Sequence, residues 1–172
     1  MKARCLGFVI SVLIVGASIA HAEGSGSSTV GYVGALLGIG MVNNSGGTNF
    51  TYGLGGGYKF MPDWSVGADF TYNSFTVPSP LTANLSLILA NIKYYFGSGG
   101  FAGLKLGEGT VSYSGTGSPG SASNLAWGPT VGYNYIFTDK WSVGGEANLI
   151  WISNSNPGVS VFQILANLKY WF

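Results

Sequence analysis

Cysteine and histidine are almost absent from this chain of 172 residues, which contains one of each. Both lie near the amino terminus, at Cys5 and His21. The rest of the chain therefore offers no disulfide framework, no cysteine or histidine ligands for zinc, and no histidine base to activate a serine nucleophile. Asp69 and Glu146 are too isolated to indicate a calcium site. These absences favour a protein that is not an enzyme and that holds no metal or other cofactor.

Charged residues are also scarce, at 8% of the chain, whereas a soluble domain has about 25%. From residue 23 onward there are five lysines, no arginine and six carboxylates, which gives a net charge of −1. This balance lacks the clustered basic patch of a nucleic-acid-binding protein, so no nucleic-acid partner is expected. So few charges argue against a surface that faces water.

A targeting segment is expected at the amino terminus. A basic start precedes an apolar run over residues 5–20, and Ala20 and Ala22 stand in a small-x-small cleavage pattern. This arrangement is typical of a secretory signal peptide, and the run is shorter than the roughly 20 residues of a membrane-spanning helix. We expect residues 1–22 to be cleaved off after Ala22, which leaves residues 23–172 as a single domain.

The remainder of the chain is divided into segments of strand length. Gly, Asn, Ser and Pro clusters separate these segments, and short and long connections alternate between them, as in transmembrane barrels. A membrane-spanning chain without spanning helices must close into a barrel. We therefore predict an all-β fold, an eight-stranded antiparallel transmembrane β-barrel with up-and-down meander order. Its strands are expected at residues 29–42, 49–60, 64–77, 84–96, 101–114, 124–137, 141–153 and 159–172.

The two halves of the chain repeat one another. The segment MPDWSVGADF at 61–70 aligns with TDKWSVGGEA at 138–147, and ILANIKYYF at 88–96 aligns with ILANLKYWF at 164–172. Barrel hairpins share a general pattern, but the identity in the second pair exceeds what that pattern requires. Each half then supplies four strands, and neither half can close alone.

The alternation of residues predicts which face of each strand lines the interior. An eight-stranded interior is just wide enough to be filled by side chains, and the aromatic residues on every strand would overfill it. In contrast to a lipocalin-like barrel, whose apolar face points inward, the aromatic phase should therefore face lipid and form a girdle at each interface. Glu108 falls in this lipid-facing phase, at the upper interface, unless a bulge at Gly107 or Gly109 turns it inward.

Four charges of the lumen-facing phase recur in the repeat. Asp69 and Lys93 in the first half correspond to Glu146 and Lys169 in the second half, and Lys105 shares their phase. Because unpaired charges in a narrow interior are costly, we expect ion pairs among them. The pairs would form a structural plug or, alternatively, a gate or selectivity constriction.

The last strand has a pattern with a known counterpart. Apolar residues alternate along it and end on an aromatic residue, at Phe162, Ile164, Leu168, Tyr170 and Phe172. This ending resembles the C-terminal assembly signal of bacterial outer-membrane barrels, and the chain from residue 23 onward resembles the eight-stranded OmpA/OmpX-like group.

The resemblance implies a location and a set of partners. It implies the outer membrane of a Gram-negative bacterium, with both termini in the periplasm. It also implies periplasmic chaperones and the barrel-assembly machinery as partners during biogenesis, and outer-membrane lipid and lipopolysaccharide as surroundings. The expected role is structural or in surface interaction, and the alternative is a narrow channel for small solutes or apolar molecules.

Overall fold

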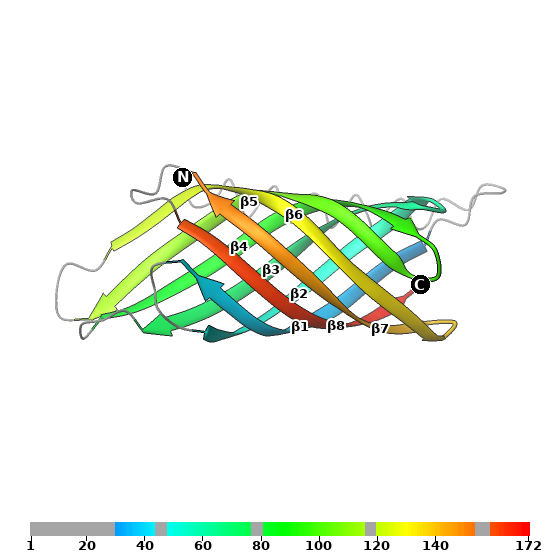
Figure 1. Cartoon of the computed structure of the whole chain (residues 1–172), viewed down its shortest axis with the longest axis horizontal. Helices are drawn as coiled ribbons and strands as arrows, with labels where there is room; N and C mark the ends of the chain where they lie inside the picture. The colour runs from blue at the N-terminus through cyan, green and yellow to red at the C-terminus, as the bar shows by residue number, and fades with distance from the viewer. Residues whose placement is uncertain (1–29, 44–47, 77–80, 116–119, 154–158) are drawn as a thin grey trace.

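The chain folds into one closed antiparallel β-barrel (Figure 1). The computed structural model describes residues 30–43, 48–76, 81–115, 120–153 and 159–172. Ala20 and Ala22, at the expected cleavage site, lie outside these residues. The predicted fold class and meander order are confirmed. The strands are β1 (Val30–Val42), β2 (Thr48–Met61), β3 (Trp64–Thr76), β4 (Leu81–Phe96), β5 (Gly100–Gly115), β6 (Gly120–Thr138), β7 (Trp141–Ile152) and β8 (Val159–Trp171).

Closure of the barrel joins β1 to β8. The two strands pair antiparallel from Tyr32 opposite Trp171 onward. Just outside this register the Gly31 N–H donates to the Phe172 carbonyl oxygen at 3.0 Å, and the Phe172 N–H donates to the Gly31 carbonyl oxygen at 2.9 Å. Closure removes the edges that an open sheet would expose to lipid.

Three tight turns gather at one end of the barrel, which we call the short-turn end; it lies on the right in Figure 1. The opposite end is the long-loop end. In the turn between β4 and β5, Gly97 and Gly99 have φ angles of 58° and 140°, which favour glycine. A side chain at Gly99 would also collide with the carbonyl oxygen of Asn134.

The internal repeat is visible in the strand pairing. The β2–β3 register shifts between Lys59 and Met61, and the β6–β7 register shifts between Ile136 and Thr138. Both irregularities lie beside a turn that precedes the repeated WSVG sequence. The duplicated sequence therefore carries a duplicated backbone irregularity.

Three strands, β4, β5 and β6, extend further than the others at the long-loop end, on the left in Figure 1. β4 begins at residue 81 and β6 at residue 120, whereas the sequence placed their starts at 84 and 124. Residues 120–123 were expected to be loop because they are small and polar, but they pair with β5. We call residues 81–86, 110–115 and 120–124 the extension.

The outer face carries the apolar residues, as expected. Side chains of Leu54, Phe70, Leu104, Val131 and Leu168 are among those that point away from the barrel and are exposed. Aromatic pairs lie across neighbouring strands near both ends: Trp64–Tyr94 and Trp141–Tyr170 at the short-turn end, and Tyr52–Tyr72 and Trp127–Trp151 towards the long-loop end. Among the described residues, no helix is long and apolar enough to cross a bilayer.

Glu108 lies on the outer face. The β4–β5 and β5–β6 registers pass through it without a shift, so no bulge turns it inward. It stands opposite Ile88 and Leu125, one outward position beyond the row of Leu106 and Trp127. This is the position expected of a carboxylate at the membrane interface nearer the long-loop end.

Candidate functional site in the barrel interior

The centre of the interior contains a network of ion pairs that crosses the barrel. Lys105 on β5 places its Nζ atom 2.7 Å from Glu146 Oε1 and 2.8 Å from Asp69 Oδ2. Lys93 on β4 places its Nζ atom 3.2 Å from Glu146 Oε2. The four residues come from β3, β4, β5 and β7, so the network joins strands that are not neighbours in the sheet.

Side-chain amides complete the surroundings of the two carboxylates. Asn91 Nδ2 donates to Asp69 Oδ2 at 3.0 Å, and Asn148 Nδ2 donates to Glu146 Oε1 at 3.1 Å. All of these side chains are buried. A buried ion pair offsets its desolvation only when hydrogen bonds satisfy the remaining lone pairs. Glu146 has partners at both of its carboxylate oxygens, and Asp69 accepts from Lys105 and Asn91 at Oδ2.

Lys169 has a different environment from the other two central lysines. Its Nζ atom donates to Asn134 Oδ1 at 3.1 Å and lies 5.0 Å and 5.4 Å from the ring centres of Tyr32 and Phe101. Among the described residues, no carboxylate oxygen lies within 4.0 Å of it. The structure thus brings Asp69, Lys93 and Glu146 together with Lys105, while Lys169 takes an amide and two rings as neighbours.

Aromatic side chains close the interior towards the short-turn end. The rings of Tyr32 and Trp171 are 4.9 Å apart, and those of Tyr95 and Phe101 are 5.6 Å apart. Trp171 Nε1 also donates to the Ser142 hydroxyl at 2.8 Å. We call the four ring-bearing residues the aromatic layer. It fills the part of the interior that lies between the ion-pair network and the short turns.

Lys59 lies over the aromatic layer from the turn side. Its Nζ atom is 4.3 Å from the ring centre of Tyr95 and 5.6 Å from that of Trp171. A cation over aromatic faces at these distances is attractive. Lys59 therefore covers the aromatic layer at the short-turn end of the interior.

Glycines make room for the large interior side chains. A Cβ atom at Gly57 would lie 2.7 Å from the Tyr32 hydroxyl, and one at Gly132 would collide with the ring of Phe101. One small cavity lies beside the network, lined by residues that include Lys93, Asn167 and Lys169. Its free space is about 10 Å³, which is room for about one water molecule.

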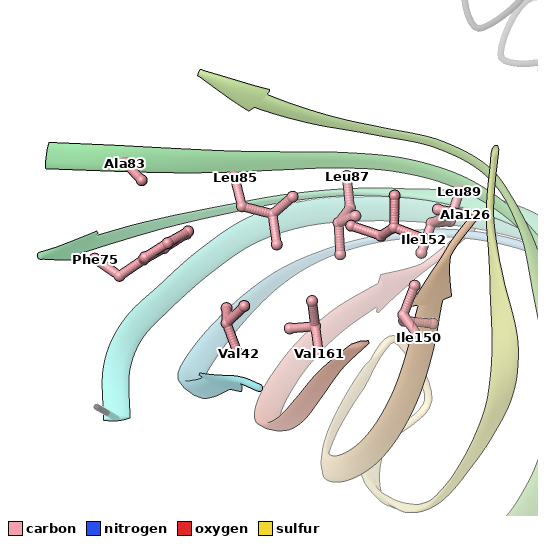
Figure 2. Close-up of a cluster of buried hydrophobic side chains, with 10 residues drawn as sticks. All are labelled: Val42, Phe75, Ala83, Leu85, Leu87, Leu89, Ala126, Ile150, Ile152 and Val161. Atoms are coloured by element: carbon pink, nitrogen blue, oxygen red, sulfur yellow. The ribbon is translucent and has the colours of Figure 1, made fainter. Parts of the chain in front are cut away.

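The long-loop half of the interior is mainly apolar, although the hydrogen-bonded pair of Thr51 and Asn73 is also buried there, with Asn73 opposite Leu85. Ten buried side chains form a cluster that points into the barrel in Figure 2. They are Val42, Phe75, Ala83, Leu85, Leu87, Leu89, Ala126, Ile150, Ile152 and Val161. We call this set the apolar cluster. It lies between the ion-pair network and the long-loop end.

The apolar cluster was not predicted from the sequence. Small and polar residues were expected to line the narrow lumen, which holds for the ion-pair network but not for the apolar cluster. The pattern was present on β4, where Leu85, Leu87 and Leu89 have the same phase as Asn91 and Lys93. A run of apolar residues in the phase of two polar ones could have identified it.

The polarity of the two faces is reversed in the extension. On β4 the outward side chains change from Ile92 and Ile88 to Ser86 and Asn84, while the inward ones change from polar to leucine. On β5 the outward residues beyond Glu108 are hydroxyl-bearing, namely Thr110, Ser112 and Ser114. Polar outside and apolar inside is the pattern of a sheet in water, so the extension has the surface of a soluble protein.

Comparison with known proteins identifies the family. The outer membrane protein beta-barrel domain family matches residues 9–172. The chain belongs to this family. Its location is accordingly the outer membrane. No curated protein matches the sequence.

Solved outer-membrane barrels share the fold. Neisserial surface protein A has a TM-score of 0.69 at 17% identity, over 85% of this chain and 99% of that one. Ail of Yersinia pestis has a TM-score of 0.58 at 15% identity, over 84% and 97%. The N-terminal barrel domain of Pseudomonas aeruginosa OprF has a TM-score of 0.52 at 18% identity, over 86% and 100%. At these identities the likeness establishes the fold.

The remaining predicted site residues lie on the outer face of β8. Phe162, Ile164 and Leu168 are exposed there, in alternation with buried residues, and Tyr170 packs against Trp141. Phe172 follows the end of β8 and is also exposed. Their proposed part in assembly stays a prediction. Among the described residues, no three of His, Cys, Asp and Glu are grouped as a metal site would require.

Proposed function

We propose that the protein is a closed, non-conducting barrel with a structural or surface-interaction role in the outer membrane. The observation that carries this proposal is the filling of the interior by three successive layers: the aromatic layer, the ion-pair network and the apolar cluster. Buried apolar side chains exclude water, and the cavity beside the paired charges has a free space of only about 10 Å³. A continuous path for hydrated ions is not supported by such a cross-section.

The proposed role does not include catalysis. The polar side chains that converge in the interior are lysines, carboxylates and amides that bond to one another. A nucleophile with an adjacent base, or an acid and base left free for a substrate, would support an enzyme. The network instead supports a structural brace.

The extension supports the proposed role in surface interaction. Its lack of positively charged residues also limits the chemistry of the ligands that it could bind. The structure of Ail has also been solved in complex with the heparin analogue sucrose octasulfate, a polyanion. In the present chain every lysine from residue 23 onward is in the centre of the barrel or towards the short-turn end, at residues 59, 93, 105, 140 and 169. The long-loop half thus lacks the cations that polyanion recognition requires, and we do not extend that ligand to this protein.

We further propose that residues 1–22 are a cleaved signal peptide and that the short-turn end faces the periplasm. Short turns on the periplasmic side and longer connections outside are the usual arrangement of bacterial barrels. Gly31 and Phe172 are hydrogen-bonded neighbours at the short-turn end. Both termini would then be periplasmic, and the extension would face the cell exterior.

Conductance of the purified protein in a planar lipid bilayer tests the closed barrel. We expect insertion without steady ion-conducting steps, because the three layers block the interior. A variant that combines Lys105→Met, Glu146→Gln and Asp69→Asn removes the ion pairs of the network. It serves as the comparison that shows how the same measurement responds when the network is weakened. Large, regular, ion-selective steps from the unmodified protein would overturn the closed barrel and favour a narrow channel.

A further inference from the structure

The extension ends in a strand edge at β6. Pairing between β6 and β7 begins at Ala126 opposite Ile152, and the Ser153 N–H donates to the Leu125 carbonyl oxygen at 2.8 Å. β6 itself starts earlier, at Gly120, and its first residues pair with β5. Residues 120–124 are therefore paired on one side only by the described strands.

The backbone groups on the open side can be assigned from the pairing. Leu125 directs its carbonyl oxygen towards β7, and in an antiparallel ladder alternate residues direct both backbone groups to the same side. Ser121 and Ser123 therefore direct an N–H and a C=O each towards the open side. Within the described part of the chain, no residue bonds to these four groups.

The two faces of the sheet differ at this edge. Ser121 and Ser123 point outward and are exposed. On the inward side, Ala122 is exposed and stands opposite Val111, which packs against the apolar cluster. The edge is therefore bordered by a polar outer face and an apolar inner face.

The edge also lacks the features that usually block strand addition. Exposed edges in soluble proteins carry lysine, proline or a bulge, which prevents pairing with other chains. Residues 120–124 read Gly-Ser-Ala-Ser-Asn, without charge or proline, and the β5–β6 register is regular along them.

We propose that the open edge of β6 at Ser121 and Ser123 binds an extended segment of a partner protein, which adds to the extension as a further β-strand. This inference rests on the proposed surface role and specifies the chemistry of the partner. The bound segment alternates apolar side chains towards Ala122 and Val111 with polar side chains on the side of Ser121. Four backbone groups at ladder spacing match the main chain of another strand, whereas a saccharide or a lipid headgroup has no such spacing.

Amide exchange measured by NMR on the mature protein in detergent micelles tests the proposal. The probe is a ten-residue peptide of alternating threonine and valine with a lysine at each end. In the free protein the Ser121 and Ser123 amides should exchange rapidly, since no described residue accepts a hydrogen bond from their N–H groups. Saturating peptide should slow both amides by at least about tenfold, while amides in the membrane-spanning strands should not change.

Backbone-blocking variants separate strand addition from side-chain contact. Ser121→Pro with Ser123→Pro removes both edge N–H groups without removing a β5–β6 ladder bond, since proline is tolerated at edges. This variant should bind the peptide at least about tenfold more weakly, in line with the loss of two backbone hydrogen bonds. Ser123→Ala, which keeps the N–H and loses the hydroxyl that meets Thr110, should bind within about threefold of the unmodified protein.

A second control keeps the proposal testable if the proline variant does not fold. In the proposed complex the threonines stand opposite Ser121 and Ser123 and direct their backbone groups at β6. The same peptide with N-methyl groups on its threonines cannot pair in this orientation, and it should not slow exchange at Ser121 or Ser123. Unchanged exchange with the unmodified peptide, or equal protection by the N-methylated one, would overturn the edge as a docking site. These results are independent of conductance, so the closed barrel can stand while the edge fails.

Discussion

Lys93 on β4 and Glu146 on β7 form an ion pair across the barrel, although they are 53 residues apart in the sequence. The two strands are not neighbours in the sheet, so the pair connects opposite parts of the wall. Removal of one partner of a buried ion pair leaves an uncompensated charge and is strongly destabilising. The pair therefore resists both widening and collapse of the interior.

The three central lysines should differ in their contributions to stability. Lys105→Met removes a lysine that contacts both Asp69 and Glu146 and should lower the free energy of unfolding by about 3–5 kcal/mol. Lys169→Met removes a lysine that contacts an amide and two rings, and it should be neutral or stabilising. Urea unfolding of the two variants in the same lipid vesicles provides the comparison, and equal losses would contradict the assignment.

Gly57 should not tolerate a side chain. A methyl group there would meet the Tyr32 hydroxyl at 2.7 Å and the Val66 carbonyl oxygen at 2.6 Å. We expect Gly57→Ala to cost about 1–3 kcal/mol through overpacking. Gly120→Ala is the matched control because a methyl group at that position would have no described atom within 4 Å. Thermal unfolding should leave the control variant close to the unmodified protein.

Arginine on the outer face of β6 should have a cost that depends on depth. Val131 is 53% exposed in the middle of the strand, and Tyr135 is 60% exposed towards the short-turn end. Val131→Arg should cost about 2–4 kcal/mol, and Tyr135→Arg about 0–1 kcal/mol from its charge. Unfolding from lipid vesicles measures both free-energy changes. A larger cost at Tyr135 than at Val131 would contradict the assignment of Val131 to the bilayer midplane.

The last residue should be required for insertion. Phe172 pairs with Gly31 through two backbone hydrogen bonds, and its ring covers the Cα of that glycine. Deletion of Phe172, or Phe172→Asp, should leave secretion intact and abolish stable insertion in the outer membrane. Heat-modifiable migration on a gel reports folding, and normal migration of the variant would count against an assembly role. Phe162→Leu is a conservative control on the same face of β8.

Much of the fold could be predicted because strand alternation and turn residues are local features. The aromatic phase and the small phase differ so much in volume that the narrow interior leaves one choice of face. The strand starts at residues 81 and 120 could not be predicted, because small polar residues are typical of both loops and water-exposed strands. Only the pairing with β5 distinguishes the two.

The interior could be predicted only in part. The phase of Asp69, Lys93 and Glu146 placed them in the lumen, but which carboxylate each lysine meets depends on side-chain reach and on strand stagger. Lys105 is on the first strand of the second half, and the corresponding first strand of the first half, β1, contains no lysine, so the duplication did not indicate the central place of Lys105. The symmetry of the sequence suggested equivalent roles for Lys93 and Lys169, and the structure gives them different partners.

The height of the β6 edge has a consequence for access at the cell surface. Ser121 lies four residues beyond Leu125, the last outward apolar residue of β6. With a rise of about 3.3 Å per residue and a strand tilt of about 40°, Ser121 lies on the order of 10 Å beyond Leu125 along the barrel axis. If the extension faces the cell exterior, as proposed, the edge would lie among the sugars of the outer leaflet. Long surface polysaccharides would then shield it from bulky proteins, whereas truncated sugars would leave it accessible.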